Sequence, residues 1–215
     1  MKFPFASLLA SIAILAAATL HSADDPKGTP LTEWMQADGS APAAGWEFKD
    51  GVIHRQGRAG DIYSAKEYAD FTLDWDWKIA VGGNSGVKYR VIKYGDAMLG
   101  PEYQMLDDAK HADGQLSTHR TAAIYDLFPA ADDKPAKPVG EWNQSRIVVK
   151  GTKFEHWLNG ARVAECDTSS PAWEDAFAKS KFKSRANWAK NPKGRIMLQD
   201  HGDEVWFRNV RITEM

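Results

Sequence analysis

The sequence predicts an all-β fold, in which two antiparallel sheets pack face to face as a sandwich with one short helix. About ten short segments alternate apolar and polar residues with the period of two that is typical of half-buried strands. Turn signals separate these segments, including Asp50 with Gly51 and Asn159 with Gly160. Only the segment after Ser170 carries the start signals of a helix. Many short strands at regular spacing favour a two-sheet sandwich.

The first half of the chain contains the clearest strand. Asp50 and Gly51 tolerate the positive φ angles of a type I′ turn and predict a hairpin between strands at residues 46–49 and 52–55. In Phe71 to Ile79, every second residue is large and apolar, which predicts one face in the core and one in solvent. A glycine-rich loop is expected at residues 82–86. Further strands are expected at residues 87–92, 102–106 and 122–128.

The second half continues the pattern. Strands are expected at residues 146–150 and 153–158, and the second of these turns at Asn159 and Gly160 into a strand at residues 162–166. Ser170 is the expected N-cap of the helix, Pro171 its first residue, and Trp173 to Lys179 its body. The last strands are expected at residues 195–198 and 205–213.

Composition limits the function classes. The 215 residues are 43% hydrophobic and 26% charged, as expected for one ordinary globular domain. Lys and Arg number 27 and Asp and Glu 29, a net charge of −2, so no positive excess exists to neutralise phosphates. We therefore expect no nucleic-acid partner.

The N-terminal segment has the layout of a secretory signal peptide. Lys2 precedes an apolar run from Phe5 to Leu20, and small residues follow up to Ala23. We expect cleavage after Ala23, or equally after Ala18, which makes residues 1–23 a signal peptide. Residues 24–33 are then a linker, and residues 34–215 a single sandwich domain. No later run is apolar enough to span a membrane.

The single cysteine, Cys166, excludes an internal disulfide, and we expect it to be a buried small hydrophobic residue. No cysteine stands at the end of the signal segment to accept a lipid. The expected location is therefore the periplasm or the extracellular medium.

Strand parity places several polar side chains together. On the strand at residues 102–106, Glu102 and Gln104 lie on one face. On the strand at residues 87–92, Lys88 and Arg90 share a face. Two interpretations remain open: a face that is simply solvated, or a ligand groove on one concave sheet, because a buried polar stripe is costly unless it lines a cleft.

Titratable residues follow the strand at residues 102–106 directly. Asp107, Asp108 and His111 lie at its end, where loops commonly carry function. A carboxylate and an imidazole can act as base and acid, and Asp107 with His111 can also bind a divalent metal ion. A solvated turn is the alternative. His201, in the stretch from Gln199 to Asp203, is either a loop cap or a residue that reaches over a sheet edge into the site.

Five strings of sequence resemble one known family. They are GNSGVKYR at residues 83–90, PEYQMLDD at 101–108, GEWNQSRIVVKG at 140–151, HWLNG at 156–160 and GRIMLQDHGDEVWFRNVRI at 194–212. Together and in this order they resemble the 3-keto-disaccharide hydrolase family, long catalogued as a domain of unknown function. The resemblance implies a concanavalin A-like jelly-roll sandwich of the lectin and glucanase type. It also implies export in bacteria that degrade glycans, and hydrolysis of oligosaccharides or other glycosides oxidised at sugar carbon 3.

The chemistry of such a substrate sets what the site must supply. A ketone at carbon 3 acidifies the proton on carbon 2, so a base can remove that proton and the enolate can expel the aglycone from carbon 1. Water then adds back. This route needs a base, an acid and a cation at the enolate oxygen, and it avoids the oxocarbenium-like transition state of ordinary glycosidases.

Candidates for each role follow from this chemistry. Glu102 or His111 is the candidate base, and Asp107 either orients the imidazole or binds a divalent metal ion. Arg90 or a metal ion is the candidate for stabilising the enolate. The candidate substrate-binding residues are Arg90, Gln104, Gln199 and His201.

Two other function classes compete with this one. A retaining endoglucanase of the same fold has acidic residues at Glu-x-Asp-x-x-Glu spacing along one strand. Asp74 and Asp76 begin a similar spacing, but position 79 is Ile79. A non-catalytic carbohydrate-binding module would bind sugars without turnover.

Overall fold

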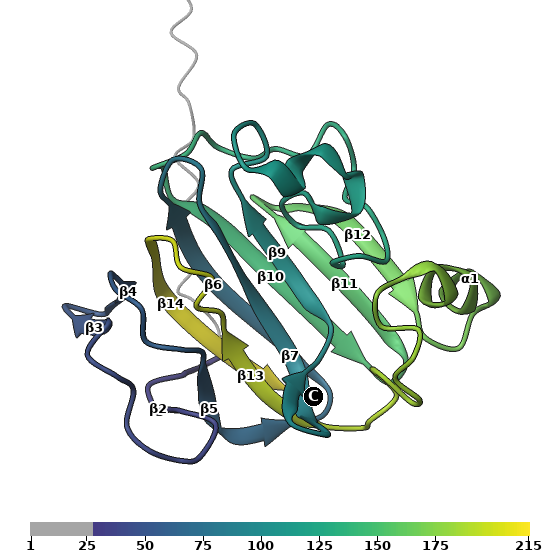
Figure 1. Cartoon of the computed structure of the whole chain (residues 1–215), viewed down its shortest axis with the longest axis horizontal. Coiled ribbons are helices and arrows are strands. Elements are labelled where there is room, and N and C mark those ends of the chain that lie inside the picture. Colours follow the sequence, from purple (N-terminus) through teal and green to yellow (C-terminus); the bar gives the residue numbers. More distant parts are fainter. Residues whose placement is uncertain (1–27) are drawn as a thin grey trace, which may run out of the picture.

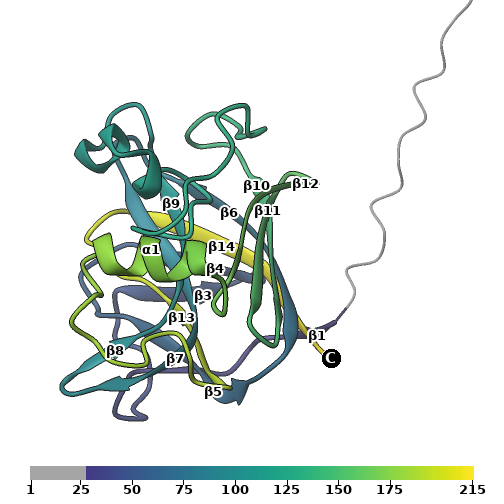
Figure 2. The same ribbon diagram turned by 90° about the vertical axis from the view of Figure 1, so that its right-hand side faces the viewer.

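A computed structural model describes residues 28–215. The predicted signal peptide, residues 1–23, lies outside the described residues. Two antiparallel sheets pack face to face, as Figures 1 and 2 show from two directions. The larger sheet has eight strands in the order β12, β11, β10, β6, β14, β4 and β3, and β1 also pairs with β14. The smaller sheet has six, in the order β2, β5, β13, β7 and β8, and β9 also pairs with β7.

The bounds of the elements are as follows: β1 Thr29–Pro30, β2 Trp34–Met35, β3 Trp46–Lys49, β4 Val52–Arg55, β5 Ile62–Tyr68, β6 Phe71–Ile79, β7 Asn84–Tyr94, β8 Ala97–Leu99, β9 Glu102–Leu106, β10 Asn143–Lys150, β11 Lys153–Leu158, β12 Ala161–Asp167, α1 Pro171–Lys179, β13 Gly194–Leu198 and β14 Val205–Glu214. Two short 3₁₀ turns, η1 Ala112–Gln115 and η2 Ser117–His119, follow β9. Among the described residues, no helix is long and apolar enough to cross a membrane.

Most of the predicted elements are confirmed. The hairpins at Asp50 and Asn159 form with positive φ angles of 50° and 47°. Strand β6 has the predicted bounds, and Ser170 caps α1 by accepting a hydrogen bond from the backbone N–H of Trp173. Cys166 is a free, half-buried thiol, and burial is the main cause that raises its pKa. It is therefore an unreactive packing residue.

The prediction of a strand at residues 122–128 is wrong. This segment hydrogen-bonds the free edge of β9, but Ala122 and Asp126 have φ angles of 67° and 62°, which interrupt any regular ladder. Only isolated bridges form, from Ile124 to Tyr103 and to Phe128. Strand β5 was not predicted, because its first three residues are all buried and the sequence IYSAKEY shows no simple alternation.

The core between the sheets is aromatic and contains a small polar network. Tyr103 of β9 meets Trp75 of β6 edge to face at 4.9 Å between ring centroids. The ring of His156, fully buried on β11, accepts a hydrogen bond from the Tyr89 hydroxyl (3.1 Å) through Nε2. It donates to the carbonyl oxygen of Ala122 (3.0 Å) through Nδ1. This network fixes the two sheets and the β9 edge relative to one another.

Replacing Gly160 with Val is expected to destabilise the fold by about 1 kcal/mol or more, because a β-branched residue is strained at positive φ. Gly160 has a φ of 86°, and no atom lies within 4 Å of the position that a Cβ would take, so the cost arises from the backbone alone. Thermal denaturation of the two proteins tests this. Gly160→Asn is the matched control and should lose less, since Asn tolerates this conformation better. An unchanged Tm in the Val variant would contradict the turn assignment.

Candidate active site

Polar side chains gather on the outer surface of the six-stranded sheet, where β7 pairs with β9. Val87, Tyr89, Tyr103 and Met105 belong to the main core, so the residues between them point away from it. These outward residues are Asn84, Gly86 and Lys88 on β7 and Glu102 and Gln104 on β9, and we call them the polar face. Lys88 lies opposite Glu102, and Gly86 opposite Gln104. Asn84, Glu102 and Gln104 are nonetheless at most 5% exposed.

Glu102 lies across the glycine of the neighbouring strand. A Cβ on Gly86 would come within 2.5 Å of Glu102 Oε1. The other carboxylate oxygen, Oε2, lies 3.6 Å from Nζ of Lys88. Because Gly86 has no side chain, the Glu102 carboxylate can lie over this position. The ammonium group of Lys88 is its partner in an ion pair.

Two amide oxygens beside Gly86 lack hydrogen-bond donors. Gln104 donates through Nε2 to Oδ1 of Asn84 (3.3 Å), but its buried Oε1 has no partner. The backbone N–H of Gln199 donates a hydrogen bond to the carbonyl oxygen of Gly86, and the buried side-chain Oε1 of Gln199 also has no partner. A buried acceptor without a donor costs free energy, so both oxygens are suited to accept hydroxyl groups of a ligand.

His111 reaches the polar face from the loop after β9. Its Nδ1 accepts a hydrogen bond from the backbone N–H of Asp113 (3.1 Å), which caps η1. A backbone N–H cannot reverse its role, so the neutral ring carries its proton on Nε2. Nε2 lies 3.5 Å from Nδ2 of Asn84 on the polar face, and since both nitrogens are donors in this tautomer they do not hydrogen-bond to each other. His111 is therefore a proton donor toward the polar face.

Asp107 does not belong to the polar face, contrary to the prediction. Its Oδ2 accepts a hydrogen bond from the N–H of Gly82 (2.8 Å), and its Oδ1 accepts from Ala109 and Lys110 (3.2 Å each). Its carboxylate is thus used to hold the loop that carries His111. It touches neither the imidazole nor the atoms of a common metal site. The alternative interpretation, a solvated turn, does not describe Asp107 either, because its side chain is buried and hydrogen-bonded to the backbone.

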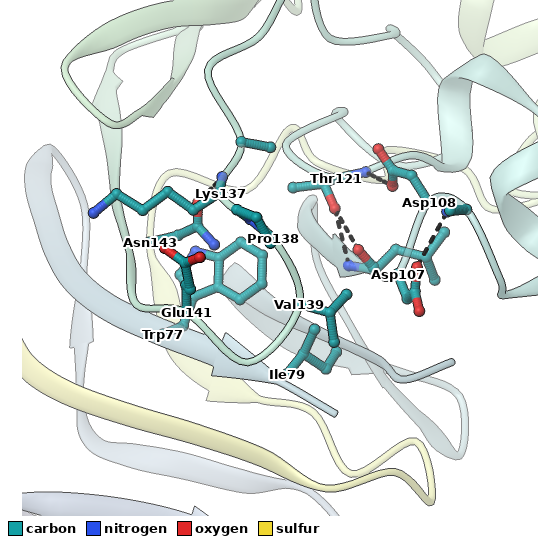
Figure 3. Close-up of a pocket in the computed structure, with 13 residues that line it drawn as sticks. Trp77, Ile79, Asp107, Asp108, Thr121, Lys137, Pro138, Val139, Glu141 and Asn143 are labelled. Carbon is teal, nitrogen blue, oxygen red and sulfur yellow. Dashed lines mark hydrogen bonds between the residues drawn. The ribbon is translucent and has the colours of Figure 1, made fainter. Parts of the chain in front are cut away.

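Asp107 also borders a separate hollow between loops. Trp77 and Ile79 of β6 line it together with Val139 and Thr121, as Figure 3 shows. A half-buried carboxylate of the same hollow, Asp108, accepts a hydrogen bond from the N–H of Thr121 and pairs with Lys134 at 2.9 Å. Since both acids are engaged in the structure of the loops, this hollow is a poor candidate for proton transfer.

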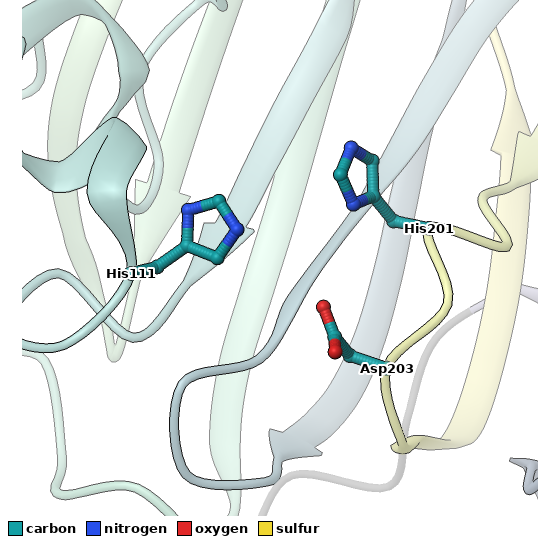
Figure 4. A group of neighbouring side chains, drawn as sticks. All are labelled: His111, His201 and Asp203. Carbon is teal, nitrogen blue, oxygen red and sulfur yellow. The ribbon is translucent and has the colours of Figure 1, made fainter.

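A second loop brings His201 and Asp203 to His111. Figure 4 shows the three side chains pointing toward one another from the two loops. One potential ligand atom from each lies within 4.8 Å of the others. Asp203 is held through Oδ2 by the N–H of Asn84 (3.0 Å), whereas His201 is exposed. Sequence reasoning identified His201 but missed Asp203, although both stand in the same motif.

These three residues do not make a ready metal site. The Nδ1 of His111 is engaged by Asp113, which leaves the proton on Nε2, the only nitrogen that could face a cation. Only His201 and Asp203 have free ligand atoms. The donor set fits a hydrogen-bonding cluster better than a closed metal centre.

Asp200 fixes this second loop. Its carboxylate lies 2.7 Å from Nε of Arg55 and accepts hydrogen bonds from the N–H groups of Ala59, Gly60 and Gly202. Burial raises the pKa of Asp200, but these hydrogen bonds and Arg55 outweigh it and lower the pKa overall. Asp107 and Asp200 thus have the same task in two loops: each holds the backbone that presents a histidine.

Arg90 lies elsewhere, contrary to the prediction. It has a φ of 46°, and the pairing of β7 with β13 contains one extra residue on β7 at this point. This bulge reverses the parity of the strand, so the guanidinium turns inward over the ring of Phe154, 5.6 Å from the centroid. It donates to the carbonyl oxygens of Ala69 and Gly151 and pairs with Asp70 at 2.9 Å. Arg90 therefore joins turns of the two sheets and does not lie on the polar face.

Three residues from outside β7 and β9 complete the electrostatics of the polar face. Burial raises the pKa of Asp61, just before β5, and Lys88 opposes that rise. Burial lowers the pKa of Lys181, and Glu102 opposes that fall. The Lys181 ammonium lies 4.1 Å from the ring centroid of Tyr125, whose backbone N–H donates to the Glu102 carbonyl. No local sequence pattern connects these residues to the site, because they come from distant loops.

Replacing Gly86 with Ala is expected to lower kcat about 10-fold or more, because the added methyl group displaces the Glu102 carboxylate from its place. The Tm should change little, since the clash is with the end of a flexible side chain outside the core. Steady-state kinetics and thermal denaturation test both statements. Gly57→Ala is the matched control: its Cβ would be 3.7 Å from the nearest atom. Full activity in Gly86→Ala would show that the position of Glu102 does not depend on this glycine.

Comparison with known proteins gives a consistent result. The family model described as the 3-keto-alpha-glucoside-1,2-lyase-like domain matches residues 23–213. A protein named 3-keto-disaccharide hydrolase, from Bacteroides thetaiotaomicron, is 34% identical over 202 residues, which cover 78% of this chain and 69% of that protein.

Solved structures agree with the sequence comparison. A crystal structure of a protein from Parabacteroides distasonis, assigned as a glycosyl hydrolase, matches with a TM-score of 0.77 and 32% identity over 85% of this chain and 88% of that one. A second crystal structure from the same organism, with the same assignment, matches with a TM-score of 0.67 and 32% identity over 79% of this chain and 90% of that one. The chain is therefore a member of the 3-keto-alpha-glucoside-1,2-lyase-like family.

Proposed function

We propose that this protein is an exported bacterial carbohydrate hydrolase that cleaves 3-keto-glycosides by elimination and rehydration. The observation that carries the proposal is the polar face itself. A carboxylate beside an ammonium group, and an imidazole that presents its N–H, lie on one surface with unpaired amide oxygens. These are the groups that removal of a proton beside a ketone requires.

The reaction begins at carbon 2. Glu102 takes the carbon 2 proton, and the electron pair of that C–H bond becomes the enolate of the carbon 3 ketone. The enolate then re-forms the ketone as a double bond appears between carbons 1 and 2 and the C–O bond to the aglycone breaks. The departing oxygen takes a proton. Water adds to carbon 1 and a proton returns to carbon 2, so the net reaction is hydrolysis.

The remaining residues have roles that follow from their hydrogen bonds. His111 donates the proton on Nε2 to the departing oxygen, because that nitrogen faces the polar face and Nδ1 is occupied. Gln104 and Gln199 accept sugar hydroxyl groups through their unpaired oxygens. His201, exposed at the rim beside His111, contacts the sugar or the aglycone.

The comparisons support this proposal in two ways. The description of the matching family names a 1,2-lyase acting on 3-keto-alpha-glucosides, which agrees with elimination across carbons 1 and 2. The Bacteroides thetaiotaomicron relative is named for hydrolysis of 3-keto-disaccharides. The signal-like segment at the N-terminus supports export.

The test compares a glycoside with its 3-keto derivative. The purified protein is incubated with each, with and without a chelator, and released aglycone is measured. Release from the keto compound alone is expected, with or without chelator, since the site holds its own acid, base and ammonium group. Release from the unoxidised glycoside alone would overturn the proposal. Binding of the keto compound without any release would identify a carbohydrate-binding module instead.

A further inference from the structure

The elimination needs a positive charge at the enolate oxygen, and Arg90 cannot supply it because its guanidinium is buried between turns of the two sheets. Lys88 stands on the polar face instead. It is the direct cross-strand partner of Glu102, with Nζ 3.6 Å from Oε2. The two side chains are only 14% and 6% exposed, so water screens their charges poorly.

We propose that the ammonium group of Lys88 stabilises the enolate formed when Glu102 removes the carbon 2 proton. This assignment rests on the proposed function. Before the reaction, the ammonium faces the negative carboxylate. When Glu102 takes the proton, the carboxylate becomes neutral and the negative charge moves to the carbon 3 oxygen, two bonds away from the carbon that lost its proton.

The ammonium therefore keeps a negative partner throughout the step. Its charge is already held in place by strand β7, so little reorganisation accompanies the transfer, which is the condition for effective electrostatic catalysis. The geometry thus couples the base to the group that receives its charge.

Lys181 is the other ammonium group near Glu102, but its position suits a different task. It comes from the loop after α1 and lies over the aromatic rings of Tyr125 and Phe182, 4.1 and 5.3 Å from their centroids. It has no direct contact with the Glu102 carboxylate comparable to that of Lys88. Lys181 therefore adds to the positive potential of the site without pairing with the base.

The experiment measures kcat and KM on a 3-keto-glycoside for wild type, Lys88→Met and Lys88→Arg. Lys88→Met should lower kcat about 100-fold or more and change KM less than about 3-fold, because the ammonium acts mainly on the charge that develops in the transition state. Lys88→Arg, which keeps the charge, should recover at least about a tenth of wild-type kcat. Lys93→Met is the matched control, since it removes an exposed lysine from the same strand. It should behave as wild type.

A second measurement isolates the enolate step. A 3-keto sugar that lacks a leaving group at carbon 1 cannot eliminate, but the enzyme should still exchange its carbon 2 proton for deuterium in D₂O. NMR follows this exchange. Lys88→Met should slow it by a factor similar to that for kcat, with circular dichroism confirming the native fold.

The outcomes separate this inference from the proposed function. If wild type cleaves the keto-glycoside and Lys88→Met keeps kcat and exchange within about 3-fold of wild type, the inference is wrong and the function stands. If Lys88→Met unfolds, Lys88→Arg decides the question, and a folded Lys88→Arg protein whose exchange rate is about 100-fold or more below wild type would overturn the inference. If wild type neither cleaves nor exchanges, the function and this inference fall together.

Discussion

Glu102→Gln is expected to lower kcat on a 3-keto-glycoside about 100-fold or more, the usual scale for loss of a general base. The amide has nearly the shape of the carboxylate but cannot accept the carbon 2 proton. The Tm should change little, because the amide has nearly the same size as the buried carboxylate and leaves no cavity. Aglycone release and thermal denaturation measure the two effects.

The exchange reaction makes this prediction specific to the base. On the 3-keto sugar without a leaving group, Glu102→Gln should also lose deuterium exchange at carbon 2, since Glu102 is the carboxylate that pairs with the Lys88 ammonium. Glu67→Gln is the matched control: it removes an exposed carboxylate that pairs with Lys193 on the same sheet. Loss of cleavage with normal exchange would assign Glu102 to protonation of the leaving group instead, and full activity would remove it from the mechanism.

The fold was predictable because its signals are local. Strand β6 alternates large apolar and polar residues over nine positions, and the Asn159 turn depends only on two adjacent residues. The segment at residues 122–128 was predicted wrongly for the opposite reason. Its apolar composition reflects burial against the edge of β9, whereas its backbone follows loop hydrogen bonds with two residues at positive φ.

The site was predictable only as far as strand parity holds. Glu102 and Gln104 share a face of β9 because that strand is regular, and Lys88 shares it across the ladder. Arg90 follows Lys88 by two residues and would share the face as well, but the bulge at Arg90 reverses the parity. A single sequence carries no local signal that tells an arginine at a β-bulge from an arginine in a regular strand.

The loops show a second limit of sequence reasoning. Asp107 and His111 lie close together in the chain, which indicated a catalytic pair. In the structure the Asp107 carboxylate accepts hydrogen bonds from backbone N–H groups, and only the imidazole of His111 faces the site. Asp61 and Lys181 are more than 100 residues apart in the chain, and both interact with Glu102 or Lys88. Only the folded structure brings such residues to one surface.

The fold itself should become less stable in acid because of one core residue. Burial lowers the pKa of His156 from 6.5 to about 4. The neutral ring accepts a hydrogen bond from Tyr89 and donates one to Ala122, and an added proton would place a positive charge in the core beside these neutral partners.

The sign follows from the order of the two pKa values. Above pH 6.5 the imidazole is neutral in both the folded and the unfolded chain, so His156 adds no pH dependence. Between pH 6.5 and about 4 only the unfolded chain takes up the proton, so the free energy of unfolding falls as the pH falls. The full loss at pH 4 is about 3 kcal/mol, from about 1.4 kcal/mol per unit of pKa difference.

Urea denaturation of wild type and His156→Gln between pH 7.5 and 4 measures this effect. Glutamine can keep both hydrogen bonds but cannot take up a proton, so the variant should lose stability less steeply in this range even if it is less stable at pH 7.5. The acidic residues titrate alike in both proteins, and the difference between the two curves therefore isolates His156. Parallel curves would show that His156 binds its proton equally well in the folded and unfolded chain, which would contradict its burial as a neutral member of the core network.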